Sequence, residues 1–528
     1  MDRKKSDHSL LIILVALVLV LCSLFFTVGN SGSGGKAAAN PAQKRIASVE
    51  QLNSSEYTVG FVTGTASMFA VEKDLPKAAH KNYSEQMSGY MSVQQGKIDA
   101  FVYEKAQMKI AIANGLEGVS LLADSLGEDT QVAVGISPVS AIPNLKGSIN
   151  KFIAELRKDG TLDDMFDRWV IQSDKDMPEI AEATDPDLVL TVGTSGIVQP
   201  YSFYGIDGLT GYDIEFSKRF AAWLGADLDF KVYDYDAIIP AALSGDIDLI
   251  CANLNVTPER QEKLDFSDYL YLIQNGVMVR DTGAVGENKG FVRSLADSFE
   301  RTFIREDRYK MFLSGIFMTI SITVMAILLG TVLGFLIYLC CRGGNAAVNK
   351  AAEILFWLVQ GMPLVVLLMI LYYLVFARTS IGGPWVAVIT FTLTFAAAMF
   401  RMLQTGVGAV DKGQYEASCA LGFSDRQTFY KVLLPQAVIH FMPSYKAEVT
   451  ALIKATAVVG YIAVQDLTKV GDIIRSRTYE AFFPLVAVAV IYFILANILT
   501  LIVQRLQISV DPKTRKPEDI LKGVTIHD

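Results

Sequence analysis

Five long apolar runs in the second half of this 528-residue chain limit its fold more than any other feature. The runs fall at 312–339, 354–376, 385–403, 433–464 and 484–503. Each is close to or above the roughly 20 apolar residues that cross the hydrocarbon core of a bilayer as a helix. Because backbone N–H and C=O groups find no water there, a helix is the structure that satisfies them within one segment. The runs therefore predict an all-α membrane domain of five helices at 312–507.

Another apolar run lies near the N-terminus, after the basic residues Arg3, Lys4 and Lys5. Its length within residues 1–30 fits either a cleaved signal peptide or an uncleaved anchor. Leu21 precedes Cys22 where a lipoprotein signal has a small residue, and no small-x-small cleavage site closes the run. We therefore expect an uncleaved signal anchor with its basic end in the cytoplasm, which places the following domain outside the membrane.

The distribution of charge predicts where the remaining parts of the chain lie. Charged residues occur throughout 44–308, although the whole chain is 51% apolar and 19% charged. A water-soluble domain is therefore expected to precede the membrane domain. The predicted soluble domain occupies 48–282, with a linker at 31–47, a second linker at 283–311 and a cytoplasmic tail at 508–528.

The soluble domain offers little for disulfide, metal or nucleic-acid chemistry. Cys251 is its one cysteine, so no disulfide can form within it. The four histidines, at positions 8, 80, 440 and 527, are scattered, so no metal site is predicted. A net charge of −8 without a basic stripe argues against nucleic acid as a partner. We expect neither a cofactor nor a catalytic residue in this chain.

Counting the five runs from an extracytoplasmic start assigns each loop to one side of the membrane. The count puts Arg342, Lys350, residues 416–436 and the basic tail at 513–516 in the cytoplasm, as the positive-inside rule expects. The same count places one segment with both signs of charge on the outside. We interpret it as a mixed-charge surface segment, and its charged residues are Lys469, Arg475, Arg477, Asp466, Asp472 and Glu480.

Three charged residues, Lys446, Glu448 and Lys454, fall within the run at 433–464. Charged side chains at membrane depth are rare and commonly functional, so these residues are candidates for a solute pathway. Alternatively, Lys446 and Glu448 lie at the cytoplasmic interface and helix ends inside the bundle satisfy Lys454. The sequence favours neither interpretation.

A polar stretch at 416–436, EASCALGFSDRQTFYKVLLPQ, separates two of the apolar runs. Gly422 is suited to end one short helix, and Ser424 with Gln427 forms a capping-box pattern that starts the next. Two short helices joined at a glycine on the membrane surface predict a docking point for another protein.

The motif EASCALG at 416–422, followed by LPQ at 434–436, resembles the cytoplasmic loop of bacterial ABC importer permeases. GMPLV at 361–365 and LIKAT at 452–456 resemble two further motifs of that family, in the family's order. Together the motifs span nearly all of 312–503 and are most similar to the permeases for polar amino acids.

This resemblance has two departures. Ser418 replaces the second alanine of the loop motif, and Ala398 stands where the subfamily often has a glutamate before the arginine that is here Arg401. The second change concerns a membrane solute site, for which the sequence leaves Lys454, Thr456 and Glu448 as candidates.

The resemblance implies that the loop is a lever inserted into a cleft on an ATPase subunit. The residues implied in this coupling are Glu416, Ala417, Ala420, Leu421 and Gly422. The ATPase is expected on a separate chain, because GSGGKAAA at 32–39 lacks the first glycine and the hydroxyl residue of a phosphate loop. A second permease copy or a homologue is expected to complete the pathway.

Two parts of the soluble domain resemble the lobes of periplasmic amino-acid-binding proteins. Residues 190–271 resemble the first lobe, and residues 48–68 with 96–104 resemble the second. Because the order is reversed, the resemblance implies an α/β two-lobed clamshell that is circularly permuted, with 171–187 joining the old termini. Lobe 2 is predicted at about 48–130 and lobe 1 at about 133–170 plus 188–282. Pairing of lobes between two copies remains an alternative.

Residue types in the two lobes predict how a solute is held. An amino acid needs a guanidinium or backbone N–H groups for its carboxylate and a carboxylate for its ammonium group. By resemblance, Arg260 and the donors Thr65 and Ala66 serve the first purpose, Glu104 serves the second, and Tyr235 is a stacking aromatic. Further candidates at the same cleft are Thr63, Asn253 and Asn255.

Each of these candidates also has a structural reading, and two departures concern the ligand. Arg260 alone could pair with Asp265 or Asp268, Glu104 alone could be an ordinary exposed acid, and Tyr235 alone could be a core residue. Val198 replaces a second stacking aromatic of the family, and Asn255 replaces a Thr or Ser, which allows for a wider cleft or another solute.

The sequence as a whole predicts a receptor and permease fused in one chain for ATP-driven uptake of a polar amino acid or a related small solute. Its predicted location is a bacterial cytoplasmic membrane, with the binding domain outside. A ligand-sensing membrane receptor and a ligand-gated channel are alternatives that use the same lobes.

Overall fold

The computed structural model describes residues 46–510 except 174–175, 182, 184–185, 206–207, 282–290, 378, 380 and 481–482. The predicted anchor at 1–30 lies outside the described residues, as do nearly all of the first linker and of the cytoplasmic tail. The chain divides into two compact units, one of Met1–Phe312 with Lys469–Val488 and one of Leu313–Thr468 with Ala489–Asp528. The sequence had assigned 469–488 to the membrane domain, whereas this segment groups with the first unit.

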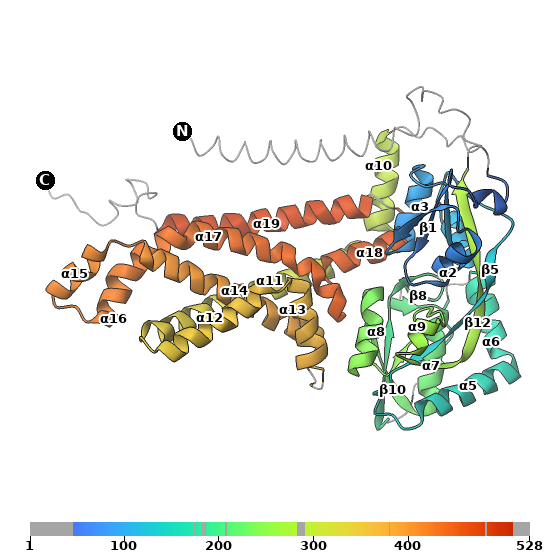
Figure 1. The fold of residues 1–528 in the computed structure, drawn as a ribbon, viewed down its shortest axis with the longest axis horizontal. Coiled ribbons are helices and arrows are strands. Elements are labelled where there is room, and N and C mark those ends of the chain that lie inside the picture. Colours follow the sequence, from blue (N-terminus) through green and yellow to red (C-terminus); the bar gives the residue numbers. More distant parts are fainter. Residues whose placement is uncertain are drawn as a thin grey trace. The chain divides into compact units, whose positions relative to one another are not determined.

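One mixed sheet runs through the first unit (Figure 1). Two antiparallel strands, β5 (Leu126–Ile136) and β12 (Asp265–Arg280), lie at its centre. The strands on the lobe 1 side are β11 (Leu249–Ile250), β6 (Leu188–Thr194) and β10 (Ala226–Val232). Those on the lobe 2 side are β3 (Ala100–Glu104), β1 (Thr58–Val62) and β2 (Ala79–Tyr83), with β4 (Val119–Leu121) paired to β12.

The central strand pair joins two α/β lobes of the same chain. The N-terminal part of β12 pairs with β5 in lobe 1, where Asp265 lies opposite Ile136. The C-terminal part of β12 pairs with β3 in lobe 2, where Asn275 lies opposite Glu104. Of the two arrangements that the sequence allowed, the structure therefore has the lobes paired within one chain.

Strands β1 and β3 are buried on both faces, as expected for parallel strands covered by helices. Side chains alternate between the faces: Phe61 and Val102 contribute to one apolar core, whereas Val62 and Phe101 contribute to another. The helices of lobe 2 are η1 (Glu50–Leu52), α2 (Ala66–Asp74), α3 (Gln86–Gln94) and α4 (Lys105–Ala113).

Lobe 1 has a third core, centred on the fully buried side chains of Trp169, Tyr212 and Phe216. Its helices are α5 (Leu145–Asp159), α6 (Thr161–Phe166), η2 (Asp167–Ile171), α7 (Tyr212–Leu224), α8 (Tyr235–Ser244) and α9 (Pro258–Gln261). A small antiparallel sheet of β7 (Ile197–Val198), β8 (Ser202–Gly205) and β9 (Gly208–Thr210) precedes α7.

Gly211 fixes the start of α7. Its φ of 122° is unfavourable for residues with a Cβ atom, and such an atom would lie 2.3 Å from the carbonyl oxygen of Tyr201. The glycine therefore allows the chain to turn beside Tyr201 and places Asp213 in the first turn of the helix.

The second unit is helical. Among the described residues, three helices are long and apolar enough to cross a membrane: α11 (Tyr309–Arg342), α14 (Gly383–Gly408) and Phe483–Arg505 of α19 (Phe483–Val510). The number rises to five, as predicted, if each of two bent helix pairs is one span: Ala346–Gly361 with Leu364–Val375, and Asp425–Ile462 with Leu467–Thr478.

The second predicted span is not one continuous helix, so this part of the prediction is wrong. Helix α12 (Ala346–Gly361) begins before the apolar run, and α13 (Leu364–Ile370) with η5 (Leu371–Val375) follows at a bend of 110°. Pro363 lies at the bend and lacks the N–H group that a continuing helix would use.

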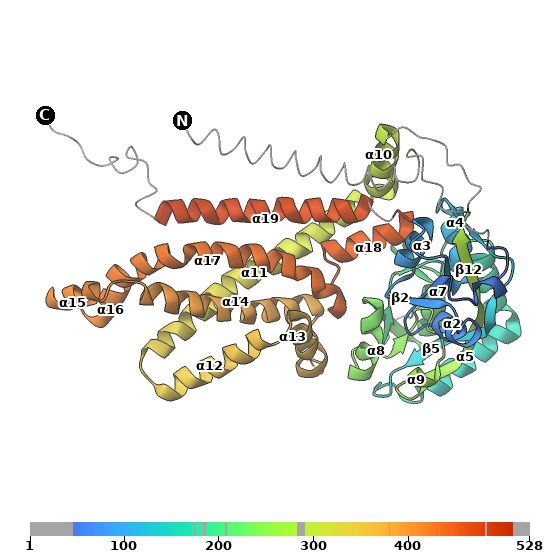
Figure 2. The same ribbon diagram turned by 45° about the horizontal axis from the view of Figure 1, so that its top comes forward.

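Helix α17 (Leu434–Ala455) packs closely against α14. Met399 and Leu403 of α14 share an apolar cluster with Phe441 of α17, and the two helices run side by side in Figures 1 and 2. The remaining elements are α15 (Lys412–Ala420), α16 (Asp425–Thr428), η6 (Phe429–Leu433) and η7 (Thr456–Ile462).

The interpretation of 466–480 as a mixed-charge surface segment is wrong. Helix α18 (Leu467–Thr478) buries Ile473 and Ile474 completely, and Lys469 is 3% exposed. Its cations are accommodated because acidic groups of the first unit pair with them, which a count of charges along the chain could not reveal.

Candidate functional site

Glu104 is at the centre of the contact between the lobes. It ends strand β3 of lobe 2 and is 3% exposed. Its carboxylate accepts hydrogen bonds from Gln107 Nε2 of the same lobe at 2.7 Å, from Asn253 Nδ2 of lobe 1 at 2.7 Å, and from the Tyr201 hydroxyl of lobe 1. Burial raises the pKa of Glu104, and the three hydrogen bonds oppose that rise.

A second buried carboxylate lies behind this contact, entirely within lobe 1. Asp213 is 1% exposed and accepts hydrogen bonds from the Asn253 backbone N–H at 2.6 Å and the Tyr271 hydroxyl at 3.4 Å. Burial raises its pKa to about 7, and the nearby charge of Glu104 acts in the same direction. Asn253 thus connects the two carboxylates through its backbone and its side chain.

Sequence reasoning missed four members of this network: Tyr201, Asp213, Tyr271 and Gln107. The rings of Tyr201 and Tyr271 stack with centroids 5.0 Å apart and planes inclined by 7°. Asp213 lies two residues after Gly211, the N-cap of α7, but nothing local in the sequence indicates burial of the carboxylate. Tyr201 and Tyr271 lie within 190–271, the segment that resembles the first lobe, but neither was among the predicted site residues.

Arg260 makes a second contact between the lobes. Its guanidinium donates to the Asn255 carbonyl of lobe 1 at 3.0 Å and to the Gly64 carbonyl of lobe 2 at 3.1 Å. Asp265, which the sequence offered as its surface partner, pairs with Lys146 at 2.9 Å instead.

Tyr235 lies at the start of α8 and is half-buried. Its environment is shared with the two lobe contacts, because Tyr235, Glu104 and Arg260 all act electrostatically on Tyr103. Burial is the main reason that the pKa of Tyr103 rises, with Tyr235 and Glu104 adding to the rise and Arg260 opposing it. The structure therefore brings these three predicted residues into one neighbourhood.

The predicted donors of lobe 2 lie at the start of α2. Ala66 is the first residue of the helix, so its N–H group has no acceptor within the helix. Thr65 is 6% exposed, and its hydroxyl donates to the Val62 carbonyl at 2.7 Å and lies 2.6 Å from Ser67 Oγ. Thr63 is exposed.

Asn255 contributes an unused acceptor on the lobe 1 side. It is 7% exposed, and among the described residues its Oδ1 has no hydrogen-bond partner. A buried acceptor without a partner is unfavourable and suits the N–H group of a bound molecule.

The predicted capping box in the cytoplasmic loop is confirmed. The Ser424 N–H donates to Gln427 Oε1 at 2.9 Å, and the Gln427 N–H donates to Ser424 Oγ at 3.3 Å. Gly422 between the helices has φ of 82°, a conformation that glycine adopts without strain. The coupling candidates Glu416, Ala417, Ala420 and Leu421 are all exposed, Leu421 to 78%.

A cavity of about 280 Å³ lies within the second unit. Arg401 of α14 and Glu448 of α17 line it with opposite charges, and Ala398 forms part of the wall. Its remaining lining residues are Val359, Gln360, Met362, Leu364 and Thr394.

The other two membrane-pathway candidates lie elsewhere in the helical unit. Lys454 is exposed, whereas Thr456 is fully buried and donates to the Ile453 carbonyl at 2.7 Å. Of the three predicted pathway residues, Glu448 is the one that lines the cavity.

Comparison with known proteins assigns residues 326–516 to the family described as "Binding-protein-dependent transport system inner membrane component". GlnP of Rickettsia bellii, whose name describes a glutamine transport system permease, is 32% identical over 192 residues, which are 36% of this chain and 87% of that protein. The arginine transport system permease protein ArtQ of Bacillus subtilis is 32% identical over 192 residues, which are 36% of this chain and 88% of that protein.

Among solved structures, the alkanesulfonate-binding protein SsuA of Xanthomonas axonopodis pv. citri aligns with 48% of this chain and 75% of its own chain. The identity is 10% and the TM-score is 0.25.

Proposed function

This chain belongs to the family of binding-protein-dependent transport system inner membrane components, and on that premise we propose that it imports a polar amino acid or a related small solute. It is a multi-pass membrane protein and the membrane subunit of an ABC importer. The two-lobed unit on the same chain is the proposed solute receptor.

The observation that carries the proposal is the pair of contacts between the lobes. Arg260 of lobe 1 reaches Gly64 of lobe 2, and Glu104 of lobe 2 reaches Asn253 of lobe 1. Bringing the lobes together therefore assembles a guanidinium and a carboxylate at one junction, which matches the two charged groups of an amino acid. Thr63, Thr65, Ala66, Tyr235 and Asn255 are the proposed further contacts.

Protein groups already occupy the hydrogen-bonding positions of Arg260 and Glu104 in this arrangement. A solute carboxylate would replace the carbonyl groups around Arg260, and a solute ammonium group would replace donors such as Asn253 and Tyr201 at Glu104. The free acceptor of Asn255 supports binding of a solute N–H group beside them. A solute would have to displace these protein contacts, so they would lower its apparent affinity while favouring contact between the lobes.

The order of the lobes along the chain supports the proposal that the receptor is circularly permuted. Residues 46–125 build lobe 2 before β5, and the described residues of 137–171 and 188–264 build lobe 1 before β12. The segment 171–187, from the last residue of η2 to the start of β6, would then join the two ancestral ends.

We place the solute pathway at the cavity lined by Arg401 and Glu448, with Lys454 and Thr456 as further candidates. Opposite charges on α14 and α17 suit a zwitterion that passes between them. A second permease copy or a homologue would supply the other side of the pathway, in a bacterial cytoplasmic membrane with the receptor outside.

A separate ATP-binding subunit is the proposed energy source, and this chain is proposed to need no cofactor or metal of its own. The exposed face of α15 with Glu416, Ala417, Ala420 and Leu421, followed by Gly422, is the proposed docking surface for that subunit. Nucleotide-driven movement of the subunit would reach the membrane helices through α15.

The test is calorimetric titration of the full chain in lipid nanodiscs with each of the common amino acids. Binding by one member that is lost in Arg260→Ala and retained in Lys146→Ala would support the proposal. Lys146 is the matched control because it is a cation of the same lobe whose pairing with Asp265 is exposed. Absence of binding by every member would contradict the amino-acid assignment.

A further inference from the structure

Two of the cations of α18 pair with acids from different lobes. Lys469 Nζ donates to Asp234 Oδ1 at 2.8 Å and to the Tyr233 carbonyl at 2.9 Å, and its side chain is 2% exposed. Asp234 is the N-cap residue of α8 in lobe 1. The N-terminal end of α18 is therefore held by lobe 1 through a charge removed from water.

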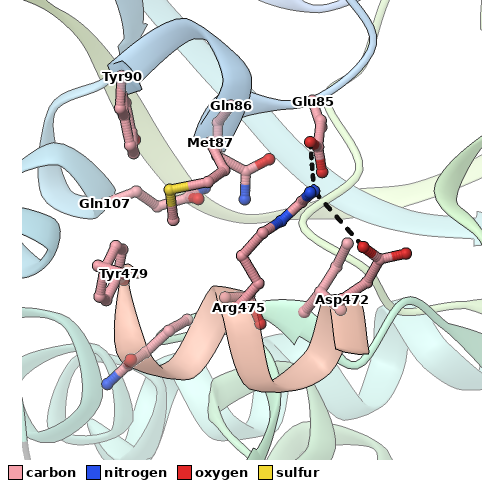
Figure 3. Close-up of a pocket in the computed structure, with 11 residues that line it drawn as sticks. Glu85, Gln86, Met87, Tyr90, Gln107, Asp472, Arg475 and Tyr479 are labelled. Atoms are coloured by element: carbon pink, nitrogen blue, oxygen red, sulfur yellow. Dashed lines mark hydrogen bonds and ion pairs between the residues drawn. The ribbon is translucent and has the colours of Figure 1, made fainter. Parts of the chain in front are cut away.

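The C-terminal half of α18 contacts lobe 2. Figure 3 shows Arg475 pointing between Glu85, the N-cap residue of α3, and Asp472 of its own helix. Tyr479 packs against the lobe 2 core that contains Tyr90. A cavity of about 20 Å³ beside Arg475 is lined mainly by residues of α18 and lobe 2, with Ile197 and Gln199 of lobe 1 at its edge.

The same half of the segment has further anchors outside the lobes. Arg477 pairs with Glu306, and Arg301 approaches Glu480 at 3.7 Å. The C-terminal end of this segment is thus held by lobe 2 and by residues 300–306 through several contacts. At the N-terminal end, the ion pair to lobe 1 is made by Lys469.

Helix geometry makes these contacts depend on the spacing of the lobes. Lys469 and Arg475 are six residues apart, which is about 9 Å along a helix axis. Both pairs can form together only while Asp234 of lobe 1 and Glu85 of lobe 2 are separated by a distance that this rigid span can bridge. Hinge movement of the lobes about β5 and β12 would change that distance.

We propose that the segment 469–480 is a two-point strap, which holds the lobes together while both ion pairs exist and releases lobe 1 first when the lobes separate. The strap is continuous in sequence with α17 before it and α19 after it. Lobe separation would therefore be communicated to the helical unit by the chain itself. The proposal does not depend on which solute binds.

The test measures amide hydrogen exchange of the full chain in lipid nanodiscs without added solute. Asp234→Asn removes the lobe 1 partner and Glu85→Gln removes the lobe 2 partner. We expect exchange to accelerate about tenfold or more in Asp234→Asn, both in the first turn of α18 and at the lobe contacts 62–66 and 251–260, as for loss of a charge-assisted hydrogen bond. Glu85→Gln should have a smaller effect, because Tyr479, Arg477 and Glu480 still hold that end.

Matched controls remove acids of surface pairs that do not touch α18. Asp265→Asn breaks the pair with Lys146 in lobe 1, and Glu128→Gln breaks the pair with Lys73 in lobe 2. Both controls should exchange as the wild type does. Faster exchange in α18 with no change at the lobe contacts would overturn the proposal.

A double variant separates the contact from the effect of an unpaired buried charge. Lys469→Met with Asp234→Asn leaves no unpaired cation, so it should fold even where Asp234→Asn alone does not. We expect its lobe contacts to exchange faster than those of the wild type. Wild-type protection in the double variant would refute the strap.

Discussion

Raising the pH should destabilise the two-lobed unit through Asp213. This carboxyl is 1% exposed and lies beside Asn253, Tyr271 and Glu104, of which the first two donate hydrogen bonds and the third can add negative charge. Its pKa is raised to about 7 from an ordinary value of 3.8, chiefly by burial. The native state therefore keeps a proton that the unfolded state releases at lower pH.

The sign and size of the effect follow from the two pKa values. Below about pH 4 the carboxyl is protonated in both states and makes no difference. Between about pH 4 and about pH 7 it ionises in the unfolded chain but stays protonated in the native protein, so the free energy of unfolding falls as pH rises. The difference of about three pH units corresponds to roughly 4 kcal/mol, which is fully lost above about pH 7.

The assay compares chemical unfolding of the wild-type chain and Asp213→Asn in detergent at about pH 5 and about pH 8. The variant cannot ionise, so its stability relative to the wild type should be higher at about pH 8 than at about pH 5. The expected difference is about 2.7 kcal/mol, because roughly two of the three pH units of effect lie between these two pH values. Asp265→Asn, an exposed acid of the same lobe, should show little such change. A difference between wild type and Asp213→Asn that is independent of pH, or larger at the lower pH, would refute the reasoning.

Three further predictions concern the coupling loop, the cavity and the core. Leu421→Asp places a charge on a side chain that is 78% exposed, so it should leave stability within about 0.5 kcal/mol of wild type but reduce solute-stimulated ATP hydrolysis of the assembled importer; unchanged hydrolysis would contradict the docking surface. Glu448→Gln should slow uptake into proteoliposomes while solute binding to the receptor stays unchanged, and equal loss of both would contradict a pathway role. Trp169→Ala removes a fully buried ring whose Nε1 donates to Glu215 at 2.6 Å, so it should lower the free energy of unfolding by about 4 kcal/mol in a denaturant titration. A loss below about 1 kcal/mol would show that the lobe 1 core does not depend on this ring.

Much of the architecture could be predicted because local patterns determine it. The lengths of the apolar runs limited where membrane helices can lie. Ser424 and Gln427, which are three residues apart, located the start of a short helix. Run length did not predict the bend at Pro363, because prolines also lie inside continuous helices, as Pro443 does in α17.

The site depended on distant partners and was predicted less completely. Resemblance directed attention to Arg260 and Glu104, and the structure brings both residues to the junction of the lobes. It did not indicate Asp213 or Tyr201, because the burial of a carboxylate and of the hydroxyl that reaches Glu104 is set by segments far away in sequence.

The sequence by itself determined that this chain has a helical membrane part, a two-lobed α/β part and a polar loop of two short helices between apolar runs. Those conclusions rest on runs and motifs whose residues lie close together in the chain. The tertiary structure alone decided that Glu104 meets Asn253 across 149 residues and that Arg475 meets Glu85 across 390. The sequence shows the type of a charged residue. Its partner and its exposure depend on which distant surfaces fold against it, and these two properties decide whether the charge stabilises or destabilises the fold.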